Sequence, residues 1–134
     1  MTTSKYLDTN VILRLVIKDN LEQLEEIKKL FDLAIAKKVK LYCSIMVIFE
    51  TEWVLRCFYK FQKNDIVEIL KNILSLKEIN FDQTEILSLT LENMAKNEIG
   101  IEDNYHVAYA ITNKQDFFSF DTKANKIFKE LTKK

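Results

Sequence analysis

The sequence predicts an α/β fold in three layers, with a short central parallel sheet flanked by helices. Short apolar segments that favour strands alternate with longer segments of helical periodicity, which is the pattern of a parallel sheet covered by helices. The chain has 134 residues, of which 48% are hydrophobic. That is enough to bury a core, so residues 1–134 are expected to form a single domain. Gly100 is the only glycine, which excludes glycine-rich phosphate-binding loops.

The strands of this sheet are expected in segments spread along the whole chain. They are residues 5–7, 39–43, 79–81 and 117–120. Right-handed crossovers between parallel strands bring the carboxyl ends of all the strands to one edge of the sheet. Ligand sites of open α/β sheets lie at this edge.

The helices are expected between these strands. Asn20 and Gln23 resemble a capping box, which opens an amphipathic helix that ends near Lys37 and Lys38. Ser44 is a favourable N-cap for the largely apolar segment 45–59. Two further helices are expected at residues 11–17 and 122–133. A third is capped by Asn64 or Asp65 and ends near residue 76, and a fourth spans residues 83–96 with Asp82 as its cap. A fifth begins at Glu102 or Asp103.

The overall charge does not indicate nucleic-acid binding, because 20 basic and 20 acidic residues cancel. Cys43 and Cys57 lie in apolar surroundings and are expected to be free thiols in a reducing compartment. The N-terminus lacks the features of a secretory signal. No segment has the roughly 20 apolar residues of a membrane span. A cytoplasmic protein is therefore expected.

Acidic side chains recur where the strands end. Asp8 and Asp121 each follow a strand segment directly, and Asp103 lies near the start of the helix that leads into the last strand. Glu50 lies in an otherwise apolar helix, where an unpaired charge is costly to bury. We expect these four carboxylates to meet at the carboxyl edge of the sheet. Oxygen ligands without cysteine or histidine favour Mg²⁺ or Mn²⁺ over zinc.

Each of these acids also has a purely structural interpretation. Asp103 and Asp121 are both suited to cap a helix, and Asp8 can simply end a strand. Glu52 is an alternative to Glu50 as the inward-facing glutamate, because residues two apart do not share a helix face. The only histidine, His106, is expected to be a surface or structural residue.

The chain resembles the PIN-domain ribonucleases, and within them the VapC-like toxins of toxin–antitoxin pairs. The resemblance rests on the segments Tyr6 to Asn10, Val47 to Leu55, Ile101 to Ala108 and Phe118 to Asp121. It implies a PIN-like fold and an acidic quartet of Asp8, Glu50, Asp103 and Asp121, and it selects Glu50 over Glu52. It also implies supporting roles for Asn10 and Ser119. Thr122 and Lys123 stand where some members carry a further acid.

The resemblance further implies a metal-dependent endoribonuclease that hydrolyses phosphodiester bonds. Asp8, Asp103 and Asp121 would be the ligands of Mg²⁺ or Mn²⁺, and Glu50 would position or deprotonate the attacking water. The implied partners are an RNA substrate, a cognate antitoxin and a second copy of the chain. Candidate cations for the RNA backbone are Lys37, Lys38, Lys40, Lys123, Lys126, Lys129, Lys133 and Lys134.

Other readings of an acidic α/β site remain open. A phosphatase of the haloacid-dehalogenase type is disfavoured, because Asp8-Thr9-Asn10 lacks the second aspartate of the Asp-x-Asp signature. A non-catalytic PIN-like module that binds RNA or protein is the remaining alternative.

Overall fold

The computed structural model describes residues 2–133 and contains seven helices and three strands in that range. In chain order these elements are β1 (Thr3–Tyr6), α1 (Thr9–Val16), α2 (Leu21–Ile35), β2 (Val39–Cys43), α3 (Ile45–Cys57), α4 (Lys63–Leu74), β3 (Ile79–Phe81), α5 (Thr84–Met94), α6 (Ile101–Thr112) and α7 (Thr122–Thr132).

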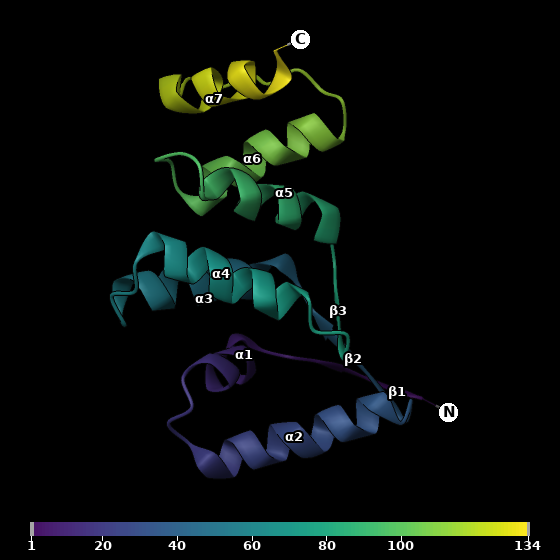
Figure 1. Cartoon of the computed structure of the whole chain (residues 1–134). Helices are drawn as coiled ribbons and strands as arrows, with labels where there is room; N and C mark the ends of the chain where they lie inside the picture. Colours follow the sequence, from purple (N-terminus) through teal and green to yellow (C-terminus); the bar gives the residue numbers. More distant parts are fainter. Residues whose placement is uncertain (1, 134) are drawn as a thin grey trace.

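The strands form a parallel sheet in the order β1-β2-β3. Helices α1 and α2 lie on one side of the sheet, α3 and α4 lie on the other, and α5, α6 and α7 stack beyond them (Figure 1). The predicted α/β fold, a short parallel sheet flanked by helices, is confirmed. Among the described residues, no helix is both long and apolar enough to span a bilayer.

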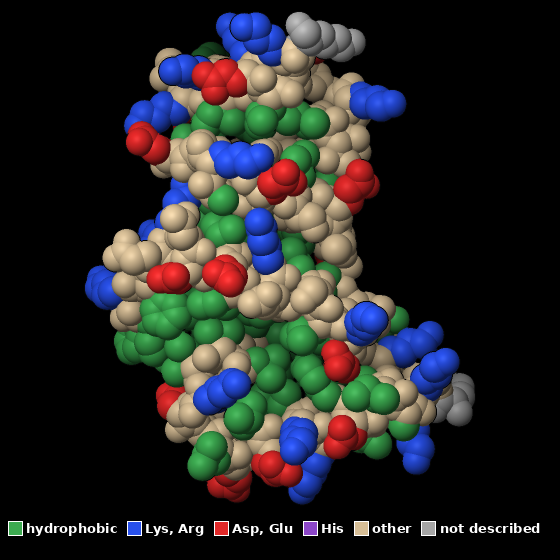
Figure 2. Space-filling view, viewed as in Figure 1, with side chains coloured by type: hydrophobic (Ala, Val, Ile, Leu, Met, Phe, Trp, Pro, Cys, Tyr) green, Lys and Arg blue, Asp and Glu red, His purple; other side chains and the backbone are tan. Residues whose placement is uncertain are grey.

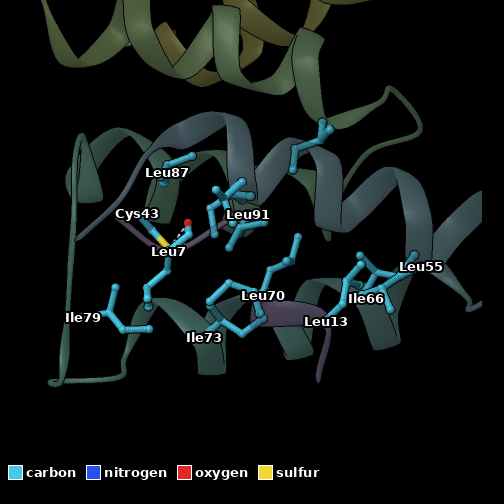
Figure 3. Close-up of a cluster of buried hydrophobic side chains, with 14 of the residues drawn as sticks. Leu7, Leu13, Cys43, Leu55, Ile66, Leu70, Ile73, Ile79, Leu87 and Leu91 are labelled. Carbon is cyan, nitrogen blue, oxygen red and sulfur yellow. Dashed lines mark hydrogen bonds between the residues drawn. The ribbon is translucent and has the colours of Figure 1, made fainter. Parts of the chain in front are cut away.

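The central strand β2 anchors the main hydrophobic core. Its side chains alternate between buried and exposed positions, so Val39, Leu41 and Cys43 face inward, as the two-residue period of a strand requires. Leu7, which follows β1, packs into the same core beside residues of α4 and α5 (Figure 3). The thiol of Cys43 donates a hydrogen bond of 3.5 Å to the Leu7 carbonyl oxygen, which joins the two strand ends inside this core.

Several helix boundaries differ from those expected. The Asn20 cap is confirmed, because its side chain accepts a hydrogen bond from the Gln23 amide. Helix α4 begins at Lys63 after Gln62, so neither Asn64 nor Asp65 caps it. Gln83, in a left-handed conformation with φ 55°, takes the N-cap position of α5 that was expected for Asp82.

The start of α4 depends on Lys63. The Lys63 ammonium group donates hydrogen bonds to the carbonyl oxygens of Asn97 and Ile99, in the loop before α6. Desolvation lowers the pKa of Lys63, although the carboxylates of Glu98 and Glu52 oppose this shift. The contact between Lys63 and the loop before α6 is distant in sequence, so local capping patterns do not predict that α4 begins at Lys63.

The expected fourth strand is absent from the sheet, and this prediction was wrong. Residues 117–120 have no assigned strand pairing within the described part of the chain. Phe117 stacks on Phe128 of α7 with ring centroids 5.5 Å apart, in a small cluster with Ile99 and Val107. This packing holds the segment against α6 and α7 rather than against β1.

Candidate active site at the carboxyl edge of the sheet

Asp8 lies at the carboxyl end of β1, as the sequence predicts. Its side chain is exposed, and Oδ1 accepts a hydrogen bond of 2.6 Å from the Thr9 amide, which makes Asp8 the N-cap of α1. Within the described residues, the second carboxylate oxygen has no hydrogen bond or ion pair. Asp8 therefore combines a capping role with an acceptor that is available to a ligand.

Thr9 is a candidate site residue that the sequence analysis did not identify. The residue is buried, and its Oγ1 is one of two buried side-chain polar atoms without a hydrogen-bond partner among the residues described. Such atoms are rare in folded proteins and usually bond a water or ligand. A small polar residue directly after Asp8 was visible in the sequence, but its burial was not.

The carboxyl ends of β1 and β2 are tied together at this edge. The hydroxyl groups of Tyr6 and Ser44 form a hydrogen bond of 2.7 Å. Ser44 takes the N-cap position of α3, as expected, but its side chain makes no capping hydrogen bond. The N-termini of α1 and α3 therefore both begin at this edge, where the helix dipoles favour negative charge such as a phosphate.

Glu50 and Glu52 have opposite environments on α3. Glu50 is exposed, whereas Glu52 is 1% exposed. The Glu52 carboxylate accepts hydrogen bonds of 2.7 and 3.2 Å from the guanidinium group of Arg56, one helical turn later. Glu50 is thus free to face a ligand, while Glu52 is occupied by an ion pair.

Asp103 is half-buried in the first turn of α6. Gly100, rather than Glu102 or Asp103, takes the N-cap position of this helix. Asn104 is fully buried, and its amide group donates hydrogen bonds to the carbonyl oxygens of Gly100 and Ile99. These bonds fix the first turn of α6 and with it the backbone that carries Asp103.

Tyr105 connects α6 to the elements at the sheet edge. Its ring packs against Phe49 of α3 with centroids 5.4 Å apart, and its hydroxyl group donates a hydrogen bond to the Gln83 side chain after β3. Burial raises the pKa of Tyr105, and the hydrogen bond to Gln83 partly opposes this shift.

Asp121 belongs to the start of α7 rather than to a strand of the sheet. It is exposed and caps α7, because its Oδ1 accepts a hydrogen bond of 3.0 Å from the Ala124 amide. Ser119 supports this arrangement, since its hydroxyl oxygen accepts a hydrogen bond of 2.9 Å from the Asp121 amide. Helix α7 lies at the far end of the helical stack from β1 (Figure 1).

The oxygen atoms of the predicted ligands suit a divalent cation, but the described residues of one chain do not bring three such ligands together. The predicted ligands offer hard oxygen atoms, which Mg²⁺ prefers. Within residues 2–133, however, no three His, Cys, Asp or Glu side chains converge on a position that could hold a metal ion. The assignment of Asp8, Glu50, Asp103 and Asp121 to one site stays a prediction.

The predicted cationic residues are dispersed over the surface. Basic and acidic side chains are interspersed on the face shown in Figure 2, without a continuous patch of one sign. Lys37, Lys38, Lys40, Lys123, Lys126, Lys129 and Lys133 are exposed, and Lys134 lies outside the described residues. His106 is exposed at the surface of α6, in line with its expected surface role.

The two thiols should differ sharply in reactivity. Burial raises the pKa of the Cys43 thiol to about 11, and the carboxylate of Asp82 adds to this increase. Since the thiolate is the reactive form, we expect iodoacetamide at neutral pH to modify half-buried Cys57 and to spare Cys43 until the protein unfolds. Mass spectrometry of the alkylated protein tests this, and equal modification of both thiols would contradict it.

The same shift predicts a dependence of stability on pH. The folded-state pKa of Cys43 lies above the ordinary value of 9.0, so its contribution to stability is fully present below pH 9.0 and declines as the pH rises toward about 11.

Comparison with known families agrees with this architecture. The family model described as PIN domain matches residues 5–131. The chain belongs to the PIN domain family. PIN domains are generally nucleases, and those nucleases generally use divalent metal ions. No curated protein and no solved structure matches the chain significantly.

Proposed function

We propose that this PIN domain is a metal-dependent endoribonuclease that hydrolyses RNA phosphodiester bonds, and that residues 1–134 act as a single domain. The observation that carries the proposal is the exposed carboxylate of Asp8 at the carboxyl edge of a PIN-family sheet. Two helix N-termini at this edge favour a phosphate group. The free cysteines fit action in the reducing cytoplasm.

The residue roles are proposed from the kind of oxygen ligand that each side chain offers. Asp8, Asp103 and Asp121 are the proposed ligands of Mg²⁺ or Mn²⁺, and Glu50 is the proposed group that orients or deprotonates water. The exposure of Glu50 and the ion pair of Glu52 support this choice between the two glutamates. Asn10 and Ser119 are proposed to support the site from the residues that flank Asp8 and Asp121.

We further propose that the chain is the VapC-like toxin of a toxin–antitoxin pair. An exposed apolar surface on and after α3 supports a protein partner. Met46 and Trp53 are each 57% exposed and Phe58 is 71% exposed. An antitoxin segment that covers these side chains would bury large apolar and aromatic groups of the kind that dominate interface energies.

The decisive experiment incubates the purified full chain with structured and unstructured RNAs. Parallel reactions contain Mg²⁺, Mn²⁺ or a chelator. Cleavage with either metal that stops with the chelator is the expected result. Cleavage that persists in the chelator would contradict metal dependence, and the absence of cleavage together with normal growth on expression would contradict the nuclease function.

A non-catalytic PIN-like module is the second candidate. It is favoured by the finding that no three potential metal ligands converge within the described residues of one chain. The exposed rings of Phe118 and Phe120 would suit stacking on unpaired RNA bases. RNA binding in a filter or mobility-shift assay, without cleavage under any metal condition, would identify this function.

A further inference from the structure

A pocket at the end of α6 lies outside the predicted acidic quartet. It has a volume of about 590 Å³ and is lined by four residues of α6, between Tyr105 and Ala110, and by residues 115–119, which follow the helix. This volume falls in the range of about 300–1,000 Å³ that is typical of small-ligand sites. None of the four predicted acids is among the lining residues.

The chain turns back at the end of α6 to form this pocket. Lys114 follows the helix in a left-handed conformation with φ 55°. Its amide donates a hydrogen bond of 3.1 Å to the Ile111 carbonyl oxygen, and the Gln115 amide donates one of 2.9 Å to the Ala110 carbonyl oxygen. These two bonds are those of a Schellman motif, which ends a helix. Residues 115–119 then line the pocket opposite α6.

The returning segment is fixed by contacts with α7. Phe117 stacks on Phe128, and the Ser119 carbonyl oxygen accepts a hydrogen bond of 2.8 Å from the Asn125 side chain. Phe118 lies between these two anchored residues, yet it is 89% exposed. The backbone therefore presents an aromatic ring to solvent from a fixed position, which lowers the entropic cost of binding a ligand there.

Aromatic rings line the pocket on both sides. Tyr105, His106 and Tyr109 lie on α6, and Phe117 and Phe118 belong to the returning segment. The rings of Tyr105 and Tyr109 pack edge to face with centroids 6.0 Å apart, and Tyr109 remains 42% exposed. RNA bases stack on such rings with little dependence on sequence, because every base has a π-face. The pocket therefore suits a flat aromatic ligand.

The polar groups of the pocket suit the edge of a guanine base. Asp116 supplies the only carboxylate among the lining residues, and Gln115 supplies a carboxamide. Within the described residues, neither side chain forms a hydrogen bond or an ion pair. An ionised carboxylate only accepts hydrogen bonds. Guanine is the RNA base that offers it two adjacent donors, N1–H and the N2 amino group, while the guanine O6 atom can accept from the Gln115 amide group.

We propose that this pocket binds an unpaired guanine base of RNA, and its link to cleavage rests on the proposed nuclease function. Asp103, His106 and Ala110 share one face of α6, because they are three and seven residues apart. His106 and Ala110 line the pocket. A helix rises about 1.5 Å per residue, so Ala110 lies roughly 10 Å along the axis from Asp103. A base in the pocket would therefore leave its strand on the face of α6 that carries Asp103.

Binding in the presence of a chelator tests the pocket without reference to cleavage. The probes are labelled uridine hexamers with a central guanine, adenine, cytosine or uracil, and fluorescence anisotropy gives their affinities. We expect the guanine hexamer to bind at least about fivefold more tightly than the others, because a two-bond contact to a base edge discriminates by that much. Equal affinities, or no binding, would overturn the proposal. Guanosine monophosphate should bind more weakly than the guanine hexamer, and equal affinity would overturn the assignment to RNA.

Two variants separate hydrogen bonding from stacking. Asp116→Asn should abolish the preference for guanine without weakening the other hexamers, because it removes only the acceptor for N1–H and the amino group. Phe118→Ala should weaken all hexamers by at least about fivefold through loss of stacking, and Phe118→Trp should retain the affinity. Phe58→Ala removes another exposed ring that does not line the pocket, so it is the matched control and should bind as the wild type does. Unchanged selectivity in Asp116→Asn, or equal losses in Phe118→Ala and Phe58→Ala, would overturn the proposal.

Photo-cross-linking locates the bound base. A hexamer with a central 6-thioguanine keeps the N1–H and amino donors and reacts with nearby side chains on irradiation. We expect cross-links to residues 105–110 or 115–119, and an excess of the unmodified guanine hexamer should suppress them. Cross-links confined to other parts of the chain would overturn the site.

Cleavage assays separate this proposal from the proposed function. With Mg²⁺ or Mn²⁺ in place of the chelator, the wild-type chain should cleave the guanine hexamer with a higher kcat/KM than the other hexamers, and Asp116→Asn should cleave all of them similarly. Guanine-selective binding without any cleavage would overturn only the nuclease function. Cleavage of all the hexamers by the wild type with equal kcat/KM would overturn only the guanine pocket.

Discussion

Asp8→Asn is expected to abolish RNA cleavage while leaving the fold intact. The substitution replaces a charged carboxylate among the proposed ligands of Mg²⁺ or Mn²⁺ by a neutral amide, and hard cations are held in proteins chiefly by carboxylates. Asparagine is as good an N-cap as aspartate, so the bond from the Thr9 amide to position 8 should survive. The variant therefore separates the catalytic role of Asp8 from its capping role. The measurements are kcat/KM on RNA and the thermal unfolding midpoint.

Asp19→Asn is the matched control for this result. Asp19 is an exposed acid that pairs with Arg14 at 3.7 Å on the surface, and such pairs contribute little. Both the activity and the unfolding midpoint of this variant should equal those of the wild type. Equal cleavage by the Asp8→Asn chain would remove Asp8 from the site.

Arg56→Ala is expected to cause the largest loss of stability. The change leaves the Glu52 carboxylate buried without its partner. Removing one partner of a fully buried ion pair lowers the free energy of unfolding by about 3 kcal/mol, and the loss here should be smaller because the Arg56 side chain is 51% exposed. Urea unfolding at neutral pH measures this difference.

The surface pair of Lys96 and Glu92 provides the comparison. These residues also lie one helical turn apart, but both are largely exposed and their charged atoms are 3.7 Å apart. Lys96→Ala should change the free energy of unfolding by less than about 0.5 kcal/mol. Similar losses in the two variants would show that Glu52 gains solvent when Arg56 is removed.

The sequence predicted the sheet well where local patterns determine it. The expected segments 39–43 and 79–81 are β2 and β3, and the Asn20 cap also forms. These elements are determined by the alternation of apolar and polar residues and by capping residues, both of which are visible within a few positions of the sequence. The parallel order follows from the helical crossovers between the strands.

Longer-range packing decided the features that the sequence did not predict. Residues 117–120 have strand-like composition, but contact with Phe128 holds them beside α7. Glu50 and Glu52 are indistinguishable by apolar periodicity, and the ion pair with Arg56 shows which one is buried. Asp8 and Asp121 cap helices as their alternative interpretation allowed. Capping is compatible with catalysis, so local structure alone does not decide between the two roles.

The hydrophobic interior is divided unequally. The main cluster is built on β2 and extends through α3, α4 and α5, whereas a much smaller cluster of Ile99, Val107 and Ala124 supports α7. Regions with few buried apolar contacts open at a lower free energy than the rest of a protein. We therefore expect the C-terminal helix to open at a lower free energy than the sheet. Because Asp121 is the N-cap of α7, its position relative to Asp8 would then change whenever α7 opens.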